Sequence, residues 1–104
     1  MSSVYCVQSD SVEVVPVIVT TVADPTGGDA PEFAFVAGDG NPSTWTAGTW
    51  GAWTAGTSSA VALTPTLPAS TATVELAEGR WTVYVRFDVG AETVVEAVGT
   101  LVVG

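Results

Sequence analysis

Histidine and lysine are both absent from the 104 residues, and cysteine occurs once, as Cys6. Without histidine the chain lacks the side chain that most often acts as a general base near neutral pH or as a metal ligand. A single cysteine cannot form an internal disulfide, so the fold must be stabilised by its core. Residues 2–10 offer no cation that would stabilise a thiolate, which favours an incidental apolar role for Cys6.

Positive charge is scarce as well. Arg80 and Arg86 are the only basic residues, against 11 acidic ones, and the net charge is −9. A surface of this sign repels nucleic-acid phosphates and anionic lipid headgroups. We therefore expect neither nucleic acid nor membrane among the partners.

Long hydrophobic runs are missing too. No stretch approaches the ~20 apolar residues that span a bilayer, and residues 1–5 lack the basic and apolar regions of a signal peptide. The sequence therefore predicts a soluble protein that is made in the cytoplasm.

Valine and threonine dominate what is present, in short runs separated by Gly, Pro and Asp. This pattern is typical of strands and turns, and no sustained 3.6-residue apolar period predicts a helix. We expect strands at 11–22, 32–37, 60–67, 72–76, 80–89 and 93–103, with irregular short strands within 44–57. The pattern predicts an all-β, immunoglobulin-like antiparallel sandwich of about seven strands, with a small closed barrel as the alternative. Pro16 indicates an edge position or a break between two strands.

Strict alternation of apolar and polar residues marks the clearest strand, at 80–89. Residues two apart in a strand share one face, so its apolar members should point into the core. The same period applies to the strand at 32–37. The predicted core comprises Phe33, Phe35, Leu76, Trp81, Val83, Val85 and Phe87.

Residues 76–85, Leu-Ala-Glu-Gly-Arg-Trp-Thr-Val-Tyr-Val, resemble the Leu-x-x-Gly-x-Tyr-x-Val-x-Val signature of bacterial and viral immunoglobulin-like domains. Trp81 stands where those domains have their corner aromatic, so no hydroxyl hydrogen bond is carried over. The Asp-Pro-Thr-Gly turn at 24–27, the Trp-rich middle and the closing segment 97–103 extend the likeness. Together they resemble small sandwich proteins encoded among the virion structural genes of tailed phages, especially those of actinobacteria. The resemblance covers residues 11–104 and implies a virion component.

Carboxylates are the only abundant titratable groups. Asp24, Asp29 and Asp39 lie in predicted loops and could bind Ca²⁺, but they lack EF-hand or nonapeptide spacing, and Asx-turns explain them. The glutamates could include a glycosidase-type pair, although solvated strand faces account for them all; these are Glu13, Glu75, Glu78, Glu92 and Glu96. We expect no enzyme, no metal and no cofactor.

Trp45, Trp50 and Trp53 do not share a parity, so an uninterrupted strand would turn Trp50 away from the other two. One could fill the core while the others form a platform for another subunit or for a sugar ring. Sugar recognition needs planar polar groups, and the chain has one Asn and one Gln, which favours a subunit contact. The alternative is that all three pack within the domain.

Residues 1–10 precede the resemblance and contain Val4, Tyr5 and Val7, with no charge before Asp10. We predict an arm that orders against a neighbouring subunit, or else an extra edge strand of the same domain, with 11–104 as the sandwich. Lys, the usual guard of sheet edges, is absent, and segments 93–98 and 101–103 hold a single charge. They must lie inside a sheet or be covered by a partner.

These observations predict a non-enzymatic virion structural protein. Its place would be on the capsid exterior, as an accessory or decoration protein, or in the head-to-tail region. The expected partners are phage capsid or connector proteins and copies of itself, with Trp45, Trp50, Trp53, Val4, Tyr5 and Val7 as interface candidates. The alternative is a carbohydrate-binding adhesion module that uses exposed tryptophans.

Overall fold

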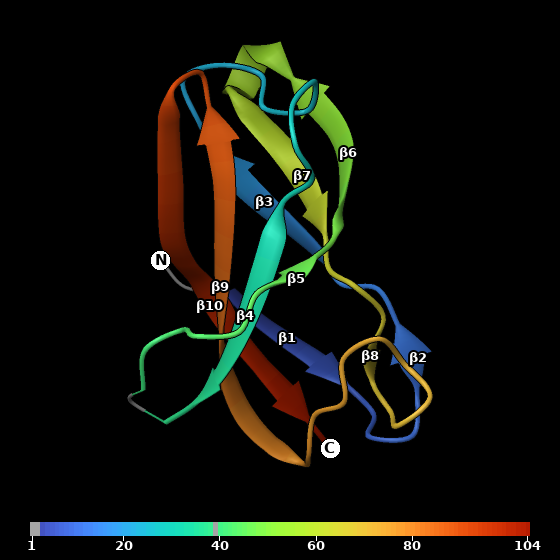
Figure 1. Cartoon of the computed structure of the whole chain (residues 1–104). Coiled ribbons are helices and arrows are strands. Elements are labelled where there is room, and N and C mark those ends of the chain that lie inside the picture. The colour runs from blue at the N-terminus through green and yellow to red at the C-terminus, as the bar shows by residue number, and fades with distance from the viewer. Residues whose placement is uncertain (1–2, 39) are drawn as a thin grey trace.

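A computed structural model describes residues 3–38 and 40–104. In this part of the chain the regular elements are ten strands and a single 3₁₀ turn, η1 (Ala55–Thr57). They form a five-stranded sheet, a three-stranded sheet and a short two-stranded one (Figure 1). The prediction of an all-β sandwich is confirmed.

The five-stranded sheet has the order β1 (Ser3–Val7), β10 (Glu92–Val103), β9 (Gly79–Val89), β4 (Glu32–Ala37), β5 (Thr46–Ala47). The three-stranded sheet has the order β3 (Pro16–Thr20), β7 (Ser59–Leu63), β6 (Thr49–Thr54). The third pairs β2 (Val12–Glu13) with β8 (Leu67–Pro68). The long β9–β10 hairpin forms the centre of the larger sheet, and the alternation at 80–89 predicted its first strand.

One pair of strands departs from the predicted antiparallel arrangement. β1 runs parallel to β10, from Ser3 opposite Gly99 to Val7 opposite Val103, so the larger sheet is mixed. In the structure, residues 3–7 form an edge strand of their own domain, which is one of the two forms that the sequence left open. Met1 and Ser2 lie outside the described residues. Val7 is buried and Tyr5 packs against the core, which is why this segment is held to the sheet.

The predicted strand at 11–22 is divided in two. β2 pairs with β8, whereas β3 pairs with β7 in the smaller sheet. The change of partner falls where Val15 precedes Pro16, and there the Val15 N–H donates to Thr64 Oγ1 at 2.9 Å. Thr64 is buried, and its hydroxyl accepts from an N–H that would otherwise be buried without a hydrogen-bond partner.

The predicted strand at 72–76 is wrong, because residues 72–74 form bends and residues 75–76 have no regular structure. Its backbone bonds run back to 66–68: the Val74 N–H donates to Thr66 O at 3.0 Å and the Leu76 N–H to Pro68 O at 2.8 Å. Thr66 Oγ1 also accepts the Thr73 N–H at 3.0 Å. Local hydroxyl bonds of this kind compete with regular ladders.

The core lies between the two larger sheets. Of the predicted core residues, five are buried and two, Phe35 and Trp81, are half-buried against the same cluster; the five are Phe33, Leu76, Val83, Val85 and Phe87. The facing sheet supplies small and β-branched partners that alternate along β3 and β7. These are Val17, Val19, Ala60 and Ala62.

Candidate functional site

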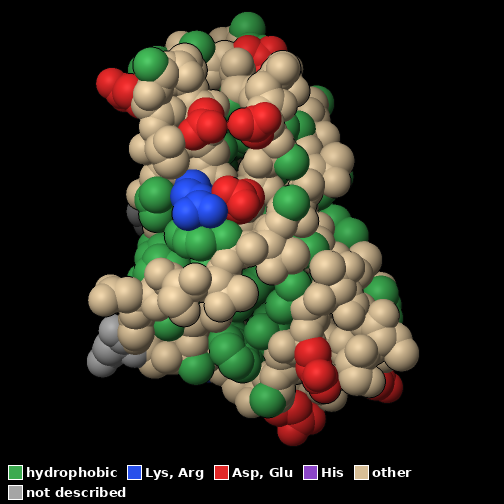
Figure 2. Space-filling view, viewed as in Figure 1, with side chains coloured by type: hydrophobic (Ala, Val, Ile, Leu, Met, Phe, Trp, Pro, Cys, Tyr) green, Lys and Arg blue, Asp and Glu red, His purple; other side chains and the backbone are tan. Residues whose placement is uncertain are grey.

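Charge is divided unequally between the two larger sheets. Residues 14–23 and 41–74 contain no charged side chain, and they supply every residue of β3, β6 and β7. Apart from Glu13 on β2, the acidic and basic groups among residues 3–38 and 40–104 lie on the five-stranded sheet and in the loops. Figure 2 shows one basic side chain beside several acidic ones on the face that fronts the viewer. A protein with a net charge of −9 therefore keeps one whole sheet neutral.

The outward side of the three-stranded sheet is an apolar and hydroxyl surface, which we call the neutral face. Along β3 and β7 the residues alternate between buried and outward positions, and the register places Ile18 opposite Val61. Ile18 is 61% exposed, although it sits in the middle of a strand. The neutral face comprises Pro16, Ile18 and Thr20 of β3, Ser59, Val61 and Leu63 of β7, and Thr49 of β6.

β3 is also an open edge of its sheet. The Thr64 N–H donates to Val15 O at 3.1 Å and the Thr21 N–H to Ser58 O at 3.0 Å, so odd-numbered residues here bond toward β7. In an antiparallel ladder the even-numbered residues then turn their N–H and C=O groups the other way. For Ile18 and Thr20 the structure gives no backbone partner on that side among residues 3–38 and 40–104.

The opposite edge of the same sheet is bridged. Where the chain crosses from β5 to β6, the Gly48 N–H donates to Pro31 O at 2.7 Å. Trp50 Nε1 donates to Asp29 O at 2.9 Å, which fastens β6 to the loop before β4. The two sides of the sandwich therefore differ: the β6 side is closed by the crossover, and the β3 side presents free backbone groups.

Trp50 and Trp53 both pack against the core, an arrangement that an uninterrupted strand would have prevented. The β6–β7 register shifts between them, and this bulge adds a residue, so positions three apart reach the same face. The Trp50 ring meets Phe87 edge-on, with centroids 5.6 Å apart. For these two tryptophans the structure shows packing within the domain.

Trp45 lies elsewhere, beside the cation of Arg86. The Arg86 Cζ sits 4.4 Å from the centre of the Trp45 ring, a cation–π contact. Arg86 Nε and Nη2 also donate to Glu32 Oε1 at 3.0 and 2.8 Å. One face of the Trp45 ring is thus covered by the guanidinium.

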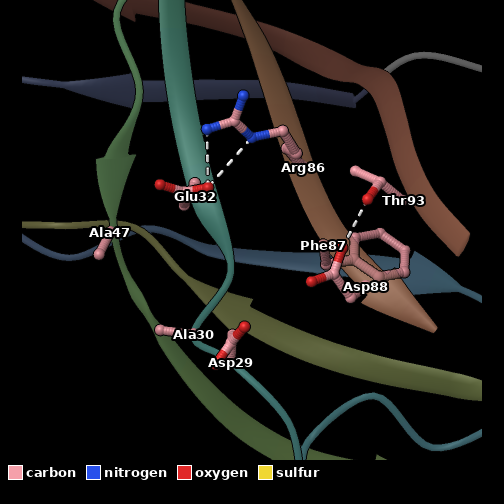
Figure 3. Close-up of a pocket in the computed structure, with 8 residues that line it drawn as sticks. All are labelled: Asp29, Ala30, Glu32, Ala47, Arg86, Phe87, Asp88 and Thr93. Atoms are coloured by element: carbon pink, nitrogen blue, oxygen red, sulfur yellow. Dashed lines mark hydrogen bonds and ion pairs between the residues drawn. The ribbon is translucent and has the colours of Figure 1, made fainter. Parts of the chain in front are cut away.

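A hollow of about 500 Å³ opens next to this ion pair, between β4, β5, β9 and the start of β10 (Figure 3). Four of its polar side chains are bonded in pairs: besides the Arg86–Glu32 pair, Thr93 Oγ1 donates to Asp88 Oδ1 at 2.7 Å. The side chains of Arg86 and Glu32 are 34% and 40% exposed, so water screens their pairing. In the part of the chain that the structure describes, no group of three or more His, Cys, Asp or Glu side chains could hold a metal ion.

The remaining candidates are placed as follows. Val7 is buried in the core, whereas Val4 is 61% exposed on the outer side of β1. Asp24 accepts the Thr26 N–H at 2.8 Å, which is an Asx-turn. Asp39 lies outside the described residues. Sequence reasoning missed the neutral face, and the signal that could have found it is the uncharged stretch at 41–74.

Comparison with protein-family models, with curated proteins and with solved structures gave no match. Over residues 3–38 and 40–104, no helix has the length and apolar character to cross a membrane.

Proposed function

We propose that this chain is a non-enzymatic structural protein of a tailed-phage virion. It acts as an accessory or decoration protein on the capsid exterior or in the head-to-tail region. One observation carries the proposal: a chain with a net charge of −9 leaves a complete sheet, and the open edge of that sheet, without charge. Proteins that work alone guard their edges with charge, whereas apolar surface left exposed marks contact with another protein.

The order of the strands supports the immunoglobulin-like arrangement that the resemblance implies. β9 begins at Gly79 within the matching segment 76–85, and its Val83 and Val85 are buried between the sheets. β9 pairs with β10 and β4, and β3, β7 and β6 form the facing sheet. This is the two-sheet layout of immunoglobulin-like sandwiches, and phage virions are where the resemblance places it.

Docking through the neutral face is the mechanism we propose. Each Å² of apolar surface removed from water contributes about 25 cal/mol, and no carboxylate on this sheet has to be desolvated. The acidic groups on the other sheet and in the loops remain in water. Before assembly, their repulsion keeps free copies soluble.

The test is a reconstitution on particles made by the phage without this protein. The purified protein is added and its cosedimentation with the particles is measured. Wild-type protein should bind to a saturable number of sites. Thr49→Glu places a charge on the exposed end of the neutral face and should abolish this binding, whereas Val95→Glu, at a 51% exposed position on β10, should preserve it.

Circular dichroism first establishes that both variants are folded. The proposal fails if wild-type protein does not bind saturably, or if the two substitutions reduce binding equally.

A further inference from the structure

The free backbone groups on β3 point to a specific partner. We propose that two copies of this chain pair edge to edge through β3, antiparallel and about a two-fold axis at Ile18. The result is a continuous six-stranded sheet in the order β6-β7-β3-β3-β7-β6 across the two copies. The proposal rests on the proposed function and names one of the contacts it requires, the contact between two copies of the chain.

The register follows from which backbone groups are free. Ile18 and Thr20 turn their N–H and C=O groups away from β7, and Pro16 turns its C=O the same way but has no N–H. With Ile18 opposite Ile18 of the second copy, these two residues exchange a pair of hydrogen bonds. The Thr20 N–H then donates to Pro16 O of the second copy. By symmetry, the Thr20 N–H of the second copy donates to Pro16 O of the first. The missing proline N–H therefore falls at the ends of the pair rather than at its centre.

Side chains support the same register. Residues directly opposite in an antiparallel pair lie on the same face, and their Cα atoms are about 5.5 Å apart in a hydrogen-bonded pair. The two Ile18 side chains would therefore meet on the neutral face, where each is now 61% exposed. Cross-strand contact between β-branched side chains stabilises such a pair. Val17 and Val19 stay in the core of their own copies.

In this register β3 is complementary to itself, and the distribution of charge allows a second copy to reach it. Two chains of charge −9 repel each other, so they can approach closely only where acidic groups are absent. β3 and its neighbour β7 carry none. Carboxylates occur toward the ends of the strand: Glu13 precedes it in the chain, and Glu92 and Thr20 line the same surface hollow. The residual repulsion predicts that the pair tightens as salt is added.

The contact is small, because β3 has only five residues. Specific interfaces usually bury about 1,200–2,000 Å² in total, so free copies should associate weakly. On a particle surface neighbouring copies are held at effective concentrations near ~1 mM, and there a weak pair becomes populated. The edge contact thus couples pairing to assembly.

Sedimentation velocity at rising concentration tests the pairing with two matched variants. Ile18 on β3 and Val4 on β1 are both 61% exposed on edge strands, so Ile18→Glu and Val4→Glu place the same charge at equivalent exposure. Wild-type protein should dimerise by about 1 mM. Ile18→Glu should raise the dissociation constant at least about 100-fold, because like charges would face each other, and Val4→Glu should leave it unchanged. A wild-type monomer at that concentration, or loss of the dimer with Val4→Glu, overturns the inference.

Disulfide trapping tests the register itself. In a Cys6→Ser background, Ile18→Cys should give covalent dimers on oxidation, because a Cα separation of about 5.5 Å suits a disulfide. Thr20→Cys should not, because it faces Pro16 of the second copy and lies about 13 Å from its own counterpart. Equal trapping of the two variants would refute the register. If wild-type protein binds particles but stays monomeric and untrapped, the pairing fails while the proposed function stands. Dimers that never bind particles would support the pairing and overturn the proposed function.

Discussion

Gly99 is the residue on which the attachment of β1 depends most visibly. It lies opposite Ser3 in the parallel pair, and a Cβ at this position would overlap the Ser3 carbonyl oxygen and lie 3.0 Å from Tyr5 Cε2. A backbone oxygen in a paired strand cannot move without moving the strand. Gly99→Ala should therefore push β1 away from β10.

The cost follows from what β1 buries. Val7 is buried and Tyr5 is half-buried against the core. Full burial of one large apolar side chain contributes about 1.5–3 kcal/mol, so displacement of the two should lower the free energy of unfolding by about 2–4 kcal/mol. For a domain of this size that is a drop of roughly 10–25 °C in the melting midpoint.

Thermal unfolding followed by circular dichroism measures this, with Gly27→Ala as the control. A Cβ on Gly27 meets nothing within 4 Å, so the control should melt within a few degrees of wild type. Deletion of residues 2–9 should lower the midpoint at least as much as Gly99→Ala. An unchanged midpoint for Gly99→Ala would refute the placement of β1 in the domain's own sheet.

Three further experiments, with five substitutions in all, test the core and its polar contacts. Phe33→Ala should cost about 3–5 kcal/mol in urea unfolding, whereas Trp81→Ala, at a half-buried position, should cost less; an equal or larger loss for Trp81 would contradict their relative burial. Thr64→Val leaves the buried Val15 N–H without its acceptor and should lower the free energy of unfolding by about 1–3 kcal/mol. Thr64→Ser keeps the hydroxyl and should lose much less stability. Glu32→Gln should cost less than about 1 kcal/mol, since its pairing with Arg86 is partly exposed, and repeating the unfolding at high salt should erase the difference.

The sandwich could be predicted because its strongest signal is local. The alternation at 80–89 depends only on the period of a strand, and Val83, Val85 and Phe87 are buried as that period requires. The punctuation by Gly, Pro and Asp was equally local. Neither signal depends on which strand is the pairing partner.

Partners and register could not be predicted in the same way. The parallel pairing of β1 with β10 depends on the close approach that Gly99 permits. A single glycine in a Val-rich run does not indicate which strand lies beside it. The parity of Trp50 and Trp53 applies only to an uninterrupted strand, and a bulge shifts the register between them. The segment 72–76 alternates like a strand but is bound by the hydroxyl and backbone of Thr66.

The neutral face illustrates a third kind of limit. Its residues come from segments about 40 positions apart in the chain, and only the pairing of β3 with β7 brings them together. The uncharged stretch at 41–74 was visible in the sequence, yet it became a surface only once its outward positions were known. Exposure, unlike alternation, is a property of the assembled fold.

The most direct test of the proposed function is quantitative mass spectrometry of intact virions, purified through a density gradient from the phage that encodes this chain. The account predicts that the protein is present in the particles at a fixed ratio to the capsid or connector proteins, and that the ratio survives repeated purification. A protein that is abundant in the infected lysate but absent from intact particles would contradict it.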